Sequence, residues 1–324
     1  MKKLKVLLLG LIMLFPSISY AYSNYIIPGG ESIGINIKTN GVLIVGFYKI
    51  NGNFNKGTPI LKPGDIITKV GDNDIYSEKD LVDSISKYMN DNEVELFIKR
   101  GNNTFKSTLS LIYSENTYKT GLYIKDNITG IGTLSYIDPT TNIFGALGHE
   151  VDETNTNQKI EVKEGTIYES AITSIDRSVR GTVGAKNARI FNDNIYGNIS
   201  KNSLYGIYGN YLNNIDTKRA IPIKSFDDIS LGEAYIYTVI DGNQKEKFKI
   251  NITRLDKNSK LKNILFDIVD EKLLSSSGGV VQGMSGSPII QDNMLLGVVT
   301  HAVVQDPKSG YGIDIISMLE EGEK

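Results

Sequence analysis

From about residue 119 onward, the chain consists of many short apolar segments separated by Gly, Asn and Asp. Residues 130–137, 233–240 and 247–252 are three examples. Segments of this length with turn residues between them are typical of strands in β-sandwiches and β-barrels. Glycine supports this prediction, because its 32 positions among 324 residues follow no collagen-like period and so indicate many tight turns. We therefore predict that residues 119–324 form an all-β domain.

The composition excludes several classes of function. Acidic residues number 37 against 35 basic ones, a formal charge of −2, so we expect no nucleic-acid partner. Cysteine is absent, which excludes thiol catalysis, thiolate zinc sites and disulfide bonds. Only two histidines are present, His149 and His301, which excludes a multi-histidine metal centre. We expect no metal and no other cofactor, and any imidazole chemistry must use one of these two residues.

Residues 1–21 have the pattern of a secretory signal peptide. Lysines at positions 2, 3 and 5 precede an apolar run over residues 6–15, and Ser19 and Ala21 supply small residues before a cleavage site. The run is shorter than the ~17–25 residues of a transmembrane helix. Cleavage would leave 32 basic and 37 acidic residues, a charge of −5. We predict export across the cytoplasmic membrane, with an uncleaved anchor as the alternative.

Residues 28–112 are predicted to form a separate small α+β domain. Residues 41–47 and 93–99 have the pattern of strands, and residues 77–80 resemble a capping box that opens an amphipathic helix. Residues 61–70 match the pattern L-x-x-G-D-x-I-x-x-V, which, followed by a helix and a strand, resembles a PDZ domain.

The glycine-rich residues 29–35 resemble the carboxylate-binding loop of PDZ domains. In such a loop, consecutive N–H groups bind a C-terminal carboxylate, and the adjoining strand edge pairs with the peptide. The resemblance implies a groove for a C-terminal peptide, which would contact Gly30, Ile33, Gly34 and Ile35. The alternative is that Ile33 and Ile35 are core residues and the domain is only a structural spacer.

The sequence Gly283-Met-Ser-Gly-Ser-Pro288 is the sharpest chemical signal. Glycines on both sides of a serine allow a strained turn that exposes the hydroxyl and directs N–H groups at one point. The segment resembles the G-D-S-G-G-P of chymotrypsin-like peptidases. This register makes Ser285 the nucleophile and the N–H groups of Gly283 and Ser285 the oxyanion hole. The alternative is an ordinary Gly-Ser turn before a strand.

A serine nucleophile needs a base, and His149 is the better candidate. It follows a glycine-rich strand end and precedes Ser285 in the chain, the order found in chymotrypsin-like peptidases. His301 lies on the strand after the serine turn, where we expect it to line the substrate cleft, although a swap of roles stays open. Two acids could orient the base, Asp176 and Asp270, and spacing alone favours Asp176.

Several blocks in order resemble the stage IV sporulation protein B peptidases. They are the opening segment 121–133, G-A-L-G-H at 145–149, V-Q-G-M-S-G-S-P-I-I at 281–290 and T-H-x-x-x-x-D-P-x-x-G-Y-G at 300–312. The resemblance implies a chymotrypsin-like double β-barrel after the PDZ domain. It also implies a triad of His149, Asp270 and Ser285, because in that family the acid precedes the serine by this short interval.

The same resemblance implies a serine endopeptidase of spore-forming bacteria. Such enzymes act between mother cell and forespore, possibly associated with a membrane, cleave protein substrates in sporulation signalling, and can cleave themselves. We expect the substrates to be membrane-associated sporulation proteins. One alternative is a non-catalytic scaffold with a PDZ domain at the membrane surface. An esterase is disfavoured because the strand–turn–helix context of G-x-S-x-G is missing.

Overall fold

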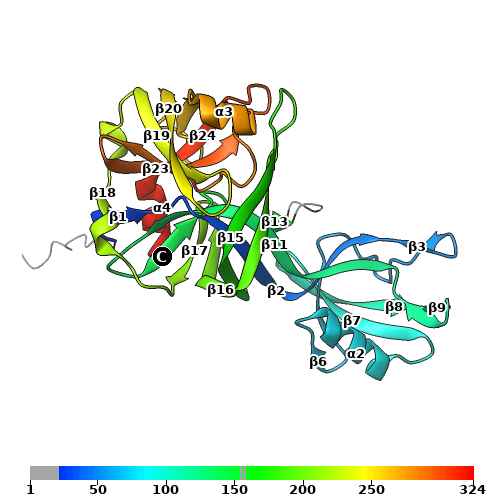
Figure 1. Ribbon diagram of the computed structural model, residues 1–324. Helices are drawn as coiled ribbons and strands as arrows, with labels where there is room; N and C mark the ends of the chain where they lie inside the picture. Colours follow the sequence, from blue (N-terminus) through cyan, green and yellow to red (C-terminus); the bar gives the residue numbers. More distant parts are fainter. Residues whose placement is uncertain (1–21, 154–155, 157) are drawn as a thin grey trace, which may run out of the picture.

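The computed structural model describes residues 22–153, 156 and 158–324, so the predicted signal segment lies outside the described residues. The chain forms two β-barrels side by side and a smaller lobe that projects from one of them (Figure 1). The predicted class, mainly β with a double barrel, is confirmed. No helix among the described residues is long and apolar enough to cross a membrane.

The first barrel is a ring of six antiparallel strands. In ring order they are β2 (Ser32–Phe47), β11 (Leu122–Ile137), β12 (Ile143–Ala146), β17 (Gly206–Tyr211), β16 (Ala185–Ser203) and β15 (Glu164–Asp176). β15 pairs with β2 and closes the ring. Alternate side chains of β2, Ile33, Ile35 and Ile37, fill the interior together with Phe144 and Ile167.

The second barrel is also closed and has six strands. In ring order they are β19 (Gly232–Val239), β20 (Lys245–Leu255), β21 (Ile264–Ile268), β24 (Ser309–Asp314), β23 (Met294–Ala302) and β22 (Pro288–Gln291). Phe248, Ile250 and Ile252 of β20 are buried, while Lys247 and Lys249 between them face outward. Residues 247–252 were predicted to be a strand because they form a short apolar segment between turn residues, and β20 confirms this prediction.

Two helices extend from the second barrel. α3 (Glu271–Ser277) follows β21, and α4 (Ile315–Gly322) follows β24 and packs Met318 and Leu319 against Tyr136 and Tyr208 of the first barrel. The short elements outside the lobe are β1 (Tyr25–Pro28), β13 (Asp152–Glu153), β14 (Gln158–Lys159), η1 (Thr217–Arg219), β18 (Ile221–Pro222) and η2 (Phe226–Asp228).

The small lobe is built on the far halves of β2 and β11. Beyond β2 its sheet continues through β5 (Ile66–Val70), β7 (Glu93–Arg100) and β8 (Asn103–Ser110), and α2 (Glu78–Tyr88) packs beside it. The predicted cap is confirmed, because Ser77 Oγ accepts a hydrogen bond from Asp80 N. Its remaining strands are β3 (Lys49–Ile50), β4 (Asn53–Phe54), β6 (Asn73–Asp74), β9 (Ile112–Ser114) and β10 (Thr117–Lys119).

The predicted boundary between the two domains needs correction. Residues 25–38, most of which were assigned to the PDZ domain, belong to the first barrel, and the lobe begins where β2 leaves that barrel near residue 40. The core of the lobe, which includes Val42, Ile67 and Leu96, is a cluster separate from that of the barrel. Two continuous strands therefore connect the lobe to the barrel.

The predicted peptide contacts at Gly30, Ile33, Gly34 and Ile35 are also corrected. Gly34 pairs on one side with Ile131 of β11 and on the other with Tyr168 of β15, and both isoleucines are buried. Gly30 N already donates a hydrogen bond to Leu134 O at 2.8 Å. A strand with both edges paired has no free edge for a peptide. This segment is barrel core, as the alternative interpretation held.

Candidate active site

Ser285 lies in the turn between α3 and β22, and hydrogen bonds fix the peptide planes of this turn. Gln282 O accepts from Lys186 N at 2.9 Å, and Met284 O accepts from Ser287 N at 2.9 Å. In a trans peptide the following N–H points away from such a carbonyl. The N–H groups of Gly283 and Ser285 are thereby held in place, and neither donates to another described residue.

The carbonyl groups of the same two residues face the first barrel. Thr133 of β11 donates its N–H to Ser285 O at 3.0 Å and its hydroxyl to Gly283 O at 2.7 Å. The side-chain hydroxyl of Ser285 donates to Thr300 O at 2.7 Å. The turn thus carries a half-buried serine hydroxyl next to two free main-chain donors.

His149 follows β12 in the first barrel, after a turn that needs positive φ. Leu147 and Gly148 both have φ of 72°, and a Cβ on Gly148 would lie 2.7 Å from a methyl carbon of Val298 in the second barrel. Glycine therefore allows the histidine turn to approach that barrel closely. This contact explains the glycine at position 148.

The ring of His149 has a defined tautomer. Nδ1 lies 2.7 Å from Glu150 O, and because a carbonyl only accepts, Nδ1 carries the proton and Nε2 is free to act as a base. Burial lowers the pKa of His149 below its ordinary value of 6.5, and the Glu150 carbonyl and the charge of Asp152 partly oppose that shift. The imidazole is therefore neutral at pH 7.

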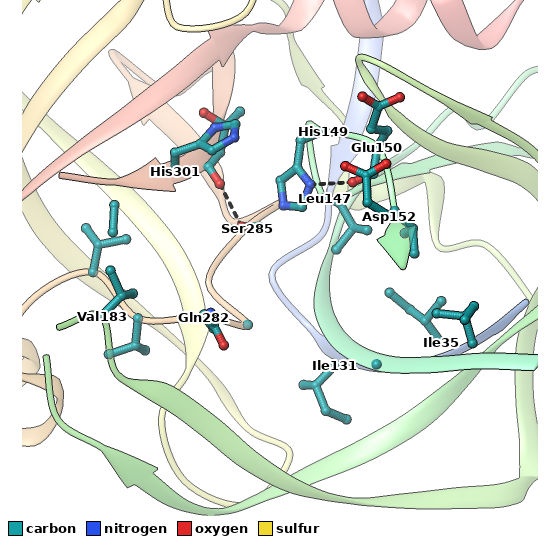
Figure 2. Close-up of a pocket in the computed structure, with 18 of the residues that line it drawn as sticks. Ile35, Ile131, Leu147, His149, Glu150, Asp152, Val183, Gln282, Ser285 and His301 are labelled. Atoms are coloured by element: carbon teal, nitrogen blue, oxygen red, sulfur yellow. Dashed lines mark hydrogen bonds between the residues drawn. The ribbon is translucent and has the colours of Figure 1, made fainter. Parts of the chain in front are cut away.

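Ser285 and His149 line one cavity between the barrels, with a volume of about 530 Å³. In Figure 2, Ser285 lies between His149 and His301. The ring centroids of the two histidines are 5.3 Å apart. Burial and then the nearby His149 lower the pKa of His301 to about 4. His301 therefore lines the cleft as a neutral side chain, in the place predicted for it.

The structure does not bring Asp270 to the imidazole. Asp270 is the N-cap of α3, where one carboxylate oxygen accepts from Leu273 N at 3.0 Å and the other from Lys249 N at 3.3 Å. Asp176 accepts from the side-chain amide of Asn187 at 3.1 Å on the protein surface. Neither acid lines the cavity, and the Glu150 carbonyl occupies Nδ1 of His149.

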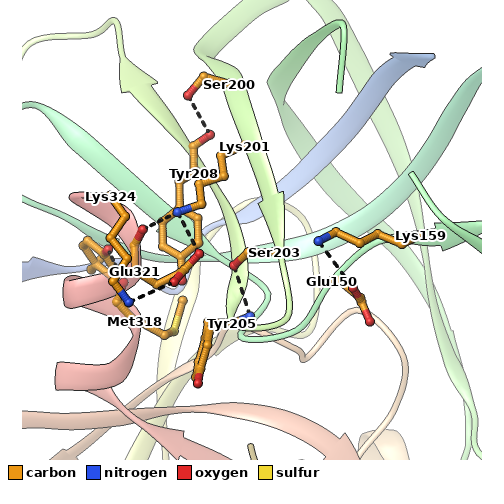
Figure 3. Close-up of polar contacts among 11 residues, drawn as sticks. Glu150, Lys159, Ser200, Lys201, Ser203, Tyr205, Tyr208, Met318, Glu321 and Lys324 are labelled. Carbon is orange, nitrogen blue, oxygen red and sulfur yellow. Dashed lines mark hydrogen bonds and ion pairs between the residues drawn. The ribbon is translucent and has the colours of Figure 1, made fainter. Parts of the chain in front are cut away.

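Two other acids, Glu150 and Asp152, do line the cavity beside His149 (Figure 2). Burial and the charge of Asp152 raise the pKa of Glu150, whose carboxylate lies 4.0 Å from Lys159 Nζ (Figure 3). The sequence showed an acid next to the base at position 150, but nothing distinguished Asp152 from other surface acids. Among the described residues, no group of three His, Cys, Asp or Glu side chains could hold a metal ion.

Two closed antiparallel barrels, with a glycine-flanked serine from one and a histidine from the other in a shared cleft, define a chymotrypsin-like serine peptidase. The family comparison agrees with this class. The family model SpoIVB peptidase S55 matches residues 116–319, and the chain belongs to this family of sporulation serine peptidases. No curated protein matches the chain. The PDZ assignment for the small lobe stays a prediction.

Proposed function

We propose that this protein is an exported serine endopeptidase that acts in sporulation signalling by limited proteolysis, with Ser285 as nucleophile and His149 as general base. The observation that carries the proposal is the meeting of these two residues in one cleft, although they come from different barrels and lie far apart in the sequence.

The proposed reaction is acyl transfer. The Ser285 hydroxyl rotates away from Thr300 O, transfers its proton to His149 Nε2 and attacks the peptide carbonyl carbon. The N–H groups of Gly283 and Ser285 stabilise the resulting oxyanion, because they are fixed and have no other acceptor. His149 then protonates the leaving amine as the C–N bond breaks. Water, deprotonated by the same imidazole, hydrolyses the acyl-enzyme.

In this proposal the main-chain carbonyl of Glu150, rather than a carboxylate, fixes the tautomer of His149. The hydrogen bond from Nδ1 to Glu150 O leaves Nε2 unprotonated, which is the function that the acid of a triad serves. Asp152 adds a negative charge near the imidazolium that forms during the reaction. The proposed catalytic unit is therefore a serine–histidine pair in which a main-chain carbonyl orients the histidine.

The proposed location and substrates come from the N-terminal sequence and the family. Residues 1–21 favour export, and family membership favours exported or membrane-associated sporulation proteins, including this chain itself, as substrates.

A fluorophosphonate probe, which reacts covalently with activated serines, tests the proposal. We expect stoichiometric labelling of the wild-type protein at Ser285, no labelling of Ser285→Ala, and loss of nearly all labelling in His149→Ala. His301→Ala should keep measurable labelling. The assignment of nucleophile and base would be refuted if folded Ser285→Ala were labelled, or if folded His149→Ala were labelled at the wild-type rate. A folded wild-type protein that does not react would favour the scaffold alternative.

A further inference from the structure

The walls of the cleft differ chemically from its centre. Ser285, His149 and Gln282 lie in the middle, and aliphatic side chains lie on both sides (Figure 2). Neither lysine nor arginine is found among the described residues that line this cavity, and its charged residues are Glu150 and Asp152, both on the side of His149. The cleft thus combines apolar walls with negative charge.

The first wall, here called the valine wall, consists of Val183, Val280 and Val281. Val280 and Val281 precede the nucleophile turn, and Val183 comes from the loop between β15 and β16. Ser178 joins these segments, because its hydroxyl donates to Val280 O at 2.7 Å and accepts from Gly184 N at 2.8 Å.

A further bond fixes the same loop to the nucleophile turn. Gln282 N donates to Gly184 O at 2.8 Å, and Ser178 N donates to Ser277 O at 2.8 Å at the end of α3. Val280 and Val281 are almost fully buried because they also belong to the core of the second barrel, whereas Val183 is partly exposed at the rim. The valine wall is therefore a preformed surface and does not need to assemble around a substrate.

The second wall, here called the isoleucine wall, lies on the other side of Ser285 and includes Ile35, Ile128 and Ile131, of which Ile35 and Ile128 also pack in the core of the first barrel. Ile35 comes from β2, and the other two come from β11, so paired barrel strands hold all three. Leu147, next to the histidine turn, continues this wall toward His149.

An extended substrate would present one side chain to each wall. Successive side chains of an extended peptide point in opposite directions. When the carbonyl of one residue lies at Ser285, the side chains before and after the cleaved bond therefore face opposite sides of the cleft. A peptide that crosses the cleft from one wall to the other would present them to the valine and isoleucine walls.

We infer that the peptidase selects bonds flanked on both sides by aliphatic residues and rejects acidic residues there. The inference rests on the proposed function. Burial of an aliphatic side chain against either wall is favourable, whereas a charge would lose water and gain no partner. An acidic side chain would in addition meet Glu150 and Asp152 on the His149 side.

Fluorogenic peptides that differ at one flanking position test this inference. The series carries Val, Leu, Lys or Asp at either position, and kcat/KM is measured for each after normalisation to the fraction of enzyme labelled by fluorophosphonate. We expect Val or Leu to exceed Asp by at least about a hundredfold at both positions, since site contacts of this kind discriminate by such factors.

A charge introduced at the rim should change the preference. Val183→Asp adds a carboxylate to the valine wall, and we expect the Lys-to-Val ratio of kcat/KM to rise by about tenfold or more at one flanking position only. Val179→Asp is the matched control, because Val179 lies in the same loop, is 58% exposed and is not a lining residue. It should leave the ratio unchanged.

The outcomes separate the two levels of the proposal. Absence of labelling in the folded wild-type protein contradicts the proposed function itself. Normal labelling with no preference among the peptides, or with Asp favoured, contradicts the aliphatic specificity alone. An equal change of ratio in both aspartate variants contradicts the assignment of Val183 to the specificity wall.

Discussion

At the scale of single residues, Thr133 connects the two halves of the candidate active site. Its N–H and hydroxyl hold the carbonyl groups of Ser285 and Gly283, and its own carbonyl lies 3.4 Å from Leu147 N, two residues before the base. Thr133 is fully buried. Thr133 thus holds the turn that carries Ser285 next to the turn that carries His149. Nothing in the sequence around Thr133 indicated this position.

We predict that Thr133→Val lowers the rate of fluorophosphonate labelling by about 10–100-fold, because the peptide plane at Gly283 loses its anchor. The unpaired carbonyl should also cost about 1–3 kcal/mol of stability. Thr133→Ser keeps the hydroxyl and should restore most of the rate. Thr39→Val is the control, since buried Thr39 donates to Gly41 O at 2.6 Å away from the cleft. If Thr133→Val and Thr39→Val were labelled at the same rate, this role of Thr133 would be refuted.

The pH dependence of labelling should report the pKa of His149. The neutral base is the reactive form, so the rate should rise with pH, with a midpoint below 6.5 because burial lowers this pKa. Asp152→Asn removes a charge that raises the pKa and should move the midpoint to lower pH. Lys262→Gln removes a charge that lowers it and should move the midpoint to higher pH. Identical profiles for all three proteins would contradict these contacts.

At the scale of secondary structure, Asp270 shows how one residue can fit two interpretations. The sequence Asp-Glu-Lys-Leu-Leu at 270–274 suits a helix start as well as a catalytic acid, and the family resemblance favoured the acid. In the structure its carboxylate caps α3, as that of Asp314 caps α4. Spacing along the chain does not determine which way a side chain faces.

The two roles predict different results for Asp270→Ser. Serine is a competent N-cap, so a capping role predicts nearly wild-type stability and retained labelling. Asp270→Ala should cost about 0.5–2 kcal/mol in urea unfolding and still leave the folded protein reactive. If folded Asp270→Ser lost labelling by a factor near ~10⁴, the triad role would be restored.

At the scale of the whole molecule, the barrels and the lobe share structure. α4 extends from the second barrel and anchors on the first, where Glu321 pairs with Lys201 at 2.7 Å beside the buried Met318 (Figure 3). β2 and β11 run without interruption from the barrel into the lobe. The family match begins at residue 116 and so omits β2, yet the first barrel closes only with this strand.

We predict that residues 119–324 alone do not fold, because the first barrel then lacks residues 32–38. We also predict that the barrels fold without the lobe, because its core is a cluster separate from theirs. Replacing residues 40–125 with Asn-Gly joins Thr39 to Asp126 as a two-residue hairpin next to the paired Lys38 and Asn127. Cooperative thermal unfolding and probe labelling should persist in this shortened protein. The prediction would be contradicted if the 119–324 fragment folded, or if the protein with Asn-Gly in place of residues 40–125 did not fold.

Local features of the structure could be predicted from the amino-acid sequence. Short apolar segments between turn residues predicted the strands, Ser77 predicted the start of α2, and the neighbouring glycines marked Ser285 and His149 as a candidate nucleophile and base, which the structure places in one cleft. Each depends on neighbouring residues, because strand alternation, helix capping and turn conformation are short-range effects.

Features that depend on pairing between distant segments could not be predicted and became known from the fold. The segment 29–35 became barrel core because β11 and β15 occupy both of its edges. Strand register and loop contacts place Thr133, Asp152 and Val183 in or next to the cleft. The N-cap position of Asp270 directs its carboxylate away from the cleft. Hydrogen-bond partners as far apart in the sequence as Thr133 and Gly283, which are separated by 150 residues, leave no local pattern that could place them together.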